Sequence, residues 1–166
     1  MISHRPRQHF ARAVRRKRVW ADTNTGLQAL TVGSKYSQDL LAGFRLAGGV
    51  TQGITIGALN YQIYTDTALV TSGDGVRLGV YVDDVSEEST EDPIAEPYAD
   101  WMWNYAHWTH RAQGGPINGT ESSQRVRSKR KVDEVGQTLW MILSREGLTV
   151  GAVNASVHVR TLLILP

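Results

Sequence analysis

The pattern of the C-terminal third constrains the fold most. In the segment Val153–Thr161, every odd-numbered residue from Val153 to Val159 is apolar and the residues between them are polar. Successive side chains of a β-strand point to opposite faces, so this alternation predicts a strand with one buried face. The preceding run TLWMILS (138–144) is continuously apolar and short enough for a buried strand, and a turn around Gly147 joins the two.

Strand-like patterns recur earlier in the chain, at residues 26–34, 50–64, 76–82 and 101–108. The apolar face of segment 50–64 changes phase near Gly57, which predicts a β-bulge there. In segment 101–108, Trp101, Trp103 and Tyr105 alternate and are expected to share one half-buried face. Segment 37–49 fits either a helix or a bent strand.

Seven or eight strands with no long helix between them predict an all-β protein, an antiparallel sandwich or barrel. No internal repeat is visible, which disfavours a solenoid or a propeller. We divide the chain into an extended basic N-terminal arm, residues 1–20, and a β-sandwich domain, residues 21–166.

The arm is strongly basic. Residues 1–18 contain seven basic side chains and no acidic one, which leaves 11 basic and 16 acidic side chains in the other 148 residues. Guanidinium groups form bidentate contacts with phosphate, and such contacts release counterions. We expect the arm to bind nucleic acid or the acidic surface of a neighbouring subunit; a solvated tail is the simplest alternative. Its basic side chains are Arg5, Arg7, Arg12, Arg15, Arg16, Lys17 and Arg18.

The body carries two further charged segments. Asp83–Asp100 has eight acids and no base, which predicts a long solvated loop that could pair with basic segments or hold a calcium ion. Segment 125–134 alternates like a strand with several bases on one face, where they repel unless an opposite surface covers them. It predicts a second site for nucleic acid or acidic loops, or an edge strand protected by its charges. This second basic patch comprises Arg125, Arg127, Lys129, Arg130 and Lys131.

Signatures of catalysis and metal binding are weak. The chain has no cysteine, which excludes disulfides, thiolate ligands and a cysteine nucleophile. His107 and His110 lie three residues apart, and on a strand this spacing puts them on opposite faces. Neither a glycine-rich phosphate loop nor a nucleophile elbow occurs. We therefore predict a non-enzymatic protein with no cofactor and no metal site.

Membrane insertion and secretion are not predicted. No apolar run reaches the roughly 20 residues that span a bilayer, and no secretory apolar stretch of about 7–15 residues follows the N-terminal charges. A mitochondrial targeting helix is disfavoured because Pro6 and the block Arg15–Arg18 interrupt its amphipathic pattern.

The arm RPRQHFARAVRRKR, followed by strands ending in GQTLWMILSREGLTVGAVNASVHVRTLLILP, resembles small jelly-roll capsid proteins of icosahedral viruses. This resemblance in plan implies a single jelly roll that tiles a shell, with the arm inside on the packaged genome or neighbouring subunits. The ending, with RVRSKRKVDE before two apolar strands, is also similar to small virion-associated proteins of bacteriophages. A body of about 145 residues is small for a jelly roll, so we expect short loops or a missing strand.

These observations favour a structural virion protein that forms homo-oligomers, with genome nucleic acid and other virion proteins as further partners. A nucleic-acid-binding barrel outside a capsid is the main alternative, with Tyr61, Tyr64 and the aromatics of 101–105 stacking on bases. An accessory head-decoration or carbohydrate-binding phage protein is another. Aromatic side chains dominate interface energetics, and the expected interface anchors are Trp20, Trp101, Trp103 and Trp108.

Overall fold

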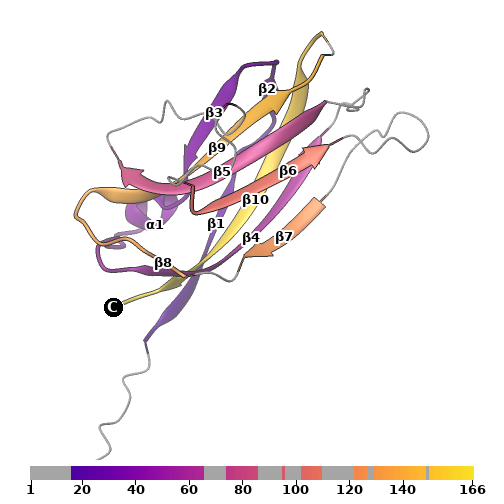
Figure 1. Cartoon of the computed structure of the whole chain (residues 1–166). Helices are drawn as coiled ribbons and strands as arrows, with labels where there is room; N and C mark the ends of the chain where they lie inside the picture. Colours follow the sequence, from indigo (N-terminus) through magenta and orange to yellow (C-terminus); the bar gives the residue numbers. More distant parts are fainter. Residues whose placement is uncertain are drawn as a thin grey trace, which may run out of the picture.

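Two antiparallel β-sheets pack face to face in this protein (Figure 1). The computed structural model describes residues 16–65, 74–85, 95, 102–109, 122–126, 129–148 and 150–166. Within these residues the single helix is α1 (Ala42–Leu46), which is only five residues long. The predicted all-β sandwich is confirmed.

Each sheet contains four main strands. Sheet A contains, in order, β1 (Arg18–Asn24), β10 (Val153–Ile164), β4 (Thr55–Thr65) and β7 (Ser122–Val126). Two short strands join it: β2 (Gln28–Leu30) pairs with β10, and β8 (Arg130–Lys131) pairs with β4. Sheet B contains, in order, β3 (Lys35–Asp39), β9 (Gln137–Glu146), β5 (Gly75–Asp84) and β6 (Asn104–Thr109).

The strand pairing has the connectivity of a jelly roll. With the short β2 and β8 set aside, the first strand pairs with the last (β1–β10), and β3 pairs with β9, β4 with β7 and β5 with β6. The chain is thus one long hairpin, which rolls up so that β10 also pairs with β4 and β9 with β5. An eight-stranded double sheet of this kind is a jelly roll. All eight strands are present despite the small body.

The core confirms the predictions for the last two strands. The alternating apolar residues of β10 are all buried, and β9 is buried from Thr138 to Arg145. Leu139, Met141 and Leu143 of β9 belong to the cluster between the sheets. The intervening Trp140 and Ile142 face the other way and form a second small cluster with Tyr81. Sheet B therefore buries apolar side chains on both of its faces.

Gly57 forms the predicted bulge. Leu162 of β10 pairs with Ala58 of β4, and the next residue, Leu163, pairs with Ile56. Gly57 is therefore the extra residue of β4, as in a two-against-one bulge. The shift in phase lets the apolar face of β4 stay in the core on both sides of the bulge.

Replacing Gly57 by valine should destabilise the fold by about 1 kcal/mol, the low end for overpacking, because the ends of the Ile164 and Leu162 side chains would have to shift. A Cβ at this position would lie 2.8 Å from Ile164 Cδ1 and 3.3 Å from Leu162 Cδ2. Urea unfolding of the Gly57→Val variant measures the effect. Gly43→Ala is the matched control, since a Cβ there meets nothing within 4 Å. Equal stability of Gly57→Val and the unaltered chain would contradict this packing.

The prediction that Trp101, Trp103 and Tyr105 form the buried face of segment 101–108 is wrong. Strand β6 begins only at Asn104, and its core-facing residues are Ala106 and Trp108. Tyr105 and His107 take the opposite face by alternation. The Trp108 ring packs edge-on against Tyr61, with ring centroids 5.9 Å apart and an interplanar angle of 84°. This contact across the sandwich belongs to the buried face of β6.

Three other segments also differ from their predictions. Segment 125–134 is not one continuous strand, because β7 ends at Val126 and β8 begins at Arg130. Asp83 and Asp84, expected in the acidic loop, end strand β5, and of the rest of that loop only residues 85 and 95 are described. The ambiguous segment 37–49 contains the end of β3 followed by α1.

Candidate functional site

The basic arm joins the sandwich at β1. Arg16 and Lys17 are exposed and precede the strand, whereas Arg18 is already its first residue. The segment Arg18–Trp20, which the sequence assigned to the arm, therefore belongs to the body. Four of the arm's basic residues lie outside the described residues: Arg5, Arg7, Arg12 and Arg15.

Strand register brings the base of the arm and the second basic patch to one end of sheet A. Arg18 pairs with Ile164, Ile164 with Thr55, and Thr55 with Lys131. Directly paired residues project to the same face of a sheet, so the exposed Arg18 and Lys131 share the outer face of sheet A. Three strand spacings separate them, about 14 Å. Two basic segments far apart in the sequence thus combine into one basic margin.

The other described residues of the second basic patch follow one edge of sheet A. Lys129 and Arg130 are exposed. Arg125 lies in β7, where it pairs in register with Asn60. Arg127 lies outside the described residues. The structure therefore divides the described bases between β7 and β8 along an edge of sheet A, rather than placing them on one face of a single strand.

A polar group occupies the middle of the outer face of sheet A. Arg160 Nε donates to Asp22 Oδ1 at 3.0 Å, and His158 Nε2 lies 3.3 Å from the same oxygen. The guanidinium carbon of Arg160 lies 5.1 Å from the ring centroid of Trp20, in a cation–π arrangement. These side chains are about half exposed, so each ion pair contributes at most about 1 kcal/mol. These side chains are therefore available to contact a partner and add little to the stability of the fold.

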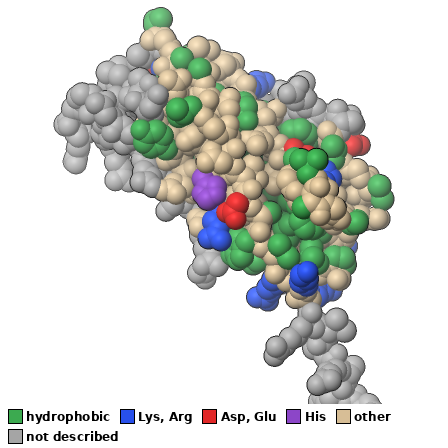
Figure 2. Space-filling model, turned by 180° about the vertical axis from the view of Figure 1, so that it is seen from behind, with side chains coloured by type: hydrophobic (Ala, Val, Ile, Leu, Met, Phe, Trp, Pro, Cys, Tyr) green, Lys and Arg blue, Asp and Glu red, His purple; other side chains and the backbone are tan. Residues whose placement is uncertain are grey.

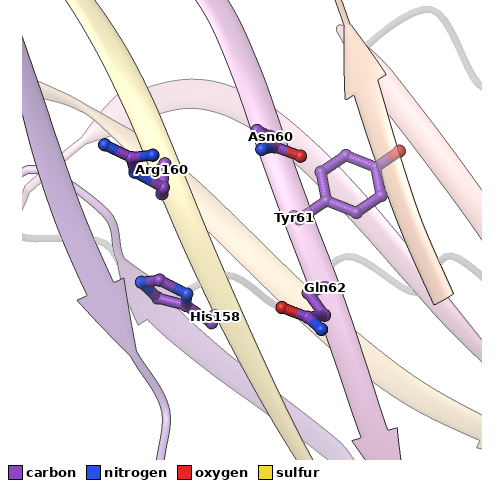
Figure 3. Close-up of a pocket in the computed structure, with 5 residues that line it drawn as sticks. All are labelled: Asn60, Tyr61, Gln62, His158 and Arg160. Carbon is purple, nitrogen blue, oxygen red and sulfur yellow. The ribbon is translucent and has the colours of Figure 1, made fainter. Parts of the chain in front are cut away.

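A shallow hollow of about 270 Å³ adjoins this group. Its walls come from Asn60 and Gln62 of β4 and from His158 and Arg160 of β10. Figure 3 shows the two amides on the same side as the imidazole and the guanidinium, whereas the Tyr61 ring points away. Amide, imidazole and guanidinium groups together can donate to and accept from a polar partner. The hollow is suited to a phosphate, a sugar or a polar protein side chain.

The outer face is apolar between this group and the basic margin. Trp20 pairs directly with Leu162, and Ile164 follows two residues later on the same face. Trp20 is 40% exposed. In Figure 2, Lys and Arg side chains gather where the described chain begins, and hydrophobic side chains gather just above them. An apolar patch rimmed by charge is a frequent feature of protein interfaces.

The expected interface tryptophans differ in their surroundings. Trp20 is exposed on the outer face of sheet A, as an interface anchor must be. Trp108 is only 9% exposed and belongs to the core, so its prediction as an anchor is wrong. Trp103 is partly buried and also packs against the core. Trp101 lies outside the described residues.

The two tyrosines proposed to stack on bases differ in exposure. Tyr61 is 1% exposed, and its hydroxyl donates to Asn104 Oδ1 at 2.9 Å. Burial raises the pKa of the Tyr61 hydroxyl well above its ordinary value. Tyr61 therefore cannot stack on a base in this fold. Tyr64, 46% exposed, remains accessible on the outer face of sheet A.

An ion cluster on sheet B was not foreseen from the sequence. Glu146 of β9 pairs with Arg77 Nη2 of β5 at 2.6 Å, and its other oxygen contacts His107 Nε2 of β6. The three residues come from neighbouring strands, so only strand register could have brought them together. Here His107 has a carboxylate partner, while His110 lies outside the described residues. Among the described residues, no group of three His, Asp or Glu side chains is arranged to hold a metal ion.

The described part of the chain contains no helix that is long and apolar enough to cross a membrane. No protein-family model matches the sequence, and no curated protein matches it.

Comparison with solved structures identifies related folds. A chain of the tomato aspermy virus crystal structure superposes with a TM-score of 0.57 at 10% sequence identity, and the match covers 98% of this chain and 88% of that one. This chain therefore shares its fold with a chain of that virus structure. Chains from turnip yellow mosaic virus and desmodium yellow mottle tymovirus match with TM-scores of 0.45 and 0.41, at 10% and 9% identity. The matches cover 91% and 100% of this chain, and 94% of each viral chain.

The match to the tomato aspermy virus chain agrees with the predicted jelly roll at the level of the fold. The structures come from plant viruses, so the likeness to bacteriophage proteins stays a prediction.

Proposed function

We propose that this protein is a non-enzymatic structural protein of a virion, which self-assembles through its β-sandwich into a shell. The observation that carries the proposal is the complete eight-stranded jelly roll, which matches a chain of a virus structure over 98% of its own length. Such sandwiches are found in viral capsids, and also in lectins and cupins. The polar hollow alone does not distinguish among these; the basic arm favours the capsid.

The arm is proposed to lie on the interior of the shell, on packaged genome, on neighbouring subunits, or on both. The described bases Arg16 and Lys17 directly precede β1, at the end of sheet A where Arg18 and Lys131 form the basic margin. Neutralising phosphates with several such cations gives strong, salt-dependent binding. The outer face of sheet A, with Trp20 at its rim, is proposed as a subunit contact.

The alternative of a nucleic-acid-binding barrel acting outside a capsid has less support. Its stacking surface needs accessible aromatic rings, and Tyr61 is buried. An accessory head-decoration or carbohydrate-binding protein retains one supporting observation. The hollow beside Trp20 combines amides, an imidazole and a guanidinium, a composition that suits a sugar as well as a phosphate.

Sedimentation velocity of the purified full chain after nuclease treatment separates these functions. A capsid protein should sediment as particles of many subunits, or reassemble into them when single-stranded RNA is added back. A free-standing binding module should instead sediment as an 18.4 kDa monomer and form only small complexes with RNA. That monomeric result, with and without RNA, would contradict the proposed function.

A further inference from the structure

An apolar groove lies beside the point where the arm leaves the sandwich. It is a hollow of about 390 Å³ whose walls include Phe44, Val50, Leu165 and Pro166. The Leu165 N–H donates to the Lys17 carbonyl oxygen at 2.9 Å. Figure 1 shows the C-terminus and the start of β1 at the same end of the molecule. The arm therefore begins directly against one wall of the groove.

Local sequence keeps this groove open. Any side chain at Gly49 would collide with the ring of Phe44, and Gly48 has a φ of +82°, a conformation that favours glycine. The Gly48-Gly49 pair thus allows the Phe44 ring to form a wall. Val50 of the groove wall is 72% exposed, and Leu46, which directly precedes the wall residue Ala47, is 90% exposed. Exposed apolar surface of this kind marks a site that another segment covers.

The helix that carries Phe44 is held in place from outside the groove. Arg45 forms an ion pair with Asp39 at the end of β3 and donates to Thr138 Oγ1 at 2.7 Å. Asp39 also accepts from the Leu41 N–H at 2.8 Å and from Thr138 Oγ1 at 2.6 Å. The groove is therefore a fixed feature of the subunit that an incoming side chain would find already formed.

The arm itself carries side chains that suit the groove. Between Arg5 and Lys17, the large hydrophobic residues are Phe10 and Val14. Lys17 follows Phe10 by seven positions, which span up to about 25 Å when extended. This is ample for a return to a groove whose wall touches Lys17. So short a tether gives an effective concentration in the millimolar range. In dilute solution a subunit's own arm therefore outcompetes that of a second copy.

Charge favours the same occupant. The Gly53 N–H donates to the Val132 carbonyl oxygen at 2.7 Å, which places the exposed Asp133 and Glu134 close to the Gln52 end of the groove. Phe10 is flanked in the sequence by Arg7 and Arg12. An arm seated by Phe10 would bring these bases toward Glu134, since Asp133 already forms an ion pair with Lys131.

We propose that the groove binds Phe10 of the same subunit's arm and holds the arm on the free subunit before assembly. This inference rests on the proposed function, which gives the arm its role in the assembled shell. The groove is the contact that the arm makes before assembly. It also accounts for an apolar groove at an otherwise charged end of the sandwich.

Disulfide trapping tests the docking, because the chain has no cysteine of its own. The test variant combines Ala11→Cys with Gln52→Cys, next to Phe10 and on the groove wall. Oxidation of the dilute full chain should give a disulfide within the monomer, detected on a non-reducing gel and by peptide mass spectrometry. Adding Phe10→Ser should reduce this product to the level of the control, whereas Phe10→Leu should retain it.

The control pairs Ala11→Cys with Leu148→Cys. Leu148 is 89% exposed but precedes the start of β10, whereas the groove lies at its end. A strand of 12 residues is about 36 Å long, beyond the reach of the subunit's own arm.

A disulfide-linked dimer as the main product, or a monomeric product that Phe10→Ser leaves unchanged, would overturn the proposal. Absence of the product in the test variant would overturn it as well. Particle formation by the reduced variants is measured separately. Failed docking with intact particles would thus refute only the docking, whereas docking without particles would refute only the proposed function.

Discussion

Trp108→Ala should lower the free energy of unfolding of the unassembled subunit by about 3–5 kcal/mol, as measured by urea denaturation. The expected loss combines transfer of a large aromatic side chain with the cavity that it leaves. The ring packs edge-on against Tyr61, and both residues belong to the cluster between the sheets. Since domains are stable by only about 5–15 kcal/mol, much of this variant could unfold near room temperature.

Trp20→Ala is the matched control, because it removes the same side chain from the outer face of sheet A. Trp20 is 40% exposed and contacts Arg160 by a cation–π interaction, so subunit stability should fall by less than about 1 kcal/mol. If the outer face is a subunit contact, this variant should instead shift sedimentation from large particles toward small species. A large stability loss for Trp20→Ala, or none for Trp108→Ala, would contradict the assignment of one to the surface and the other to the core.

Neutralising the distal arm should have the largest effect on nucleic-acid binding. In the full chain we expect replacement of Arg5, Arg7, Arg12 and Arg15 by glutamine to weaken binding of a single-stranded oligonucleotide on the order of 100-fold at 0.1 M salt. If each arginine neutralises one phosphate, the slope of log K against log salt should become shallower by about 2.8. Fluorescence anisotropy across a salt series measures both quantities.

The second basic patch supplies a comparison for that experiment. Lys129, Arg130 and Lys131 are exposed at the same end of sheet A as the base of the arm, but at the opposite edge. Their replacement by glutamine removes nearly as much charge but leaves the arm intact. If this triple variant loses as much affinity as the arm variant, the two segments form one continuous site. An unchanged salt slope in the arm variant would refute phosphate binding by the arm.

Sequence patterns predicted the structure best where the burial of a residue follows from the alternation within its own strand. The alternation in Val153–Thr161 predicts β10 because each strand presents its faces with a period of two. The change of phase at Gly57 similarly predicts the bulge that the pairing of β4 with β10 shows. Both signals are local, and neither depends on which strand lies alongside.

Predictions that needed knowledge of neighbours were less successful. Trp103 and Trp108 carry the same side chain, but Trp108 lies in β6 and packs against Tyr61 of the opposite sheet, whereas Trp103 precedes β6 and is only partly buried. The basic margin formed by Arg18 and Lys131 follows from three successive strand pairings. The contact of Glu146 with Arg77 and His107 follows from two more. Such juxtapositions arise only when the long hairpin rolls up.

Negative-stain electron microscopy of the purified full chain, with and without added single-stranded RNA, tests the central claim most directly. The jelly roll and its basic arm predict closed shells of uniform diameter in at least one of the two samples. A field without particles in both samples, together with a mass of 18.4 kDa in solution, would contradict a capsid role.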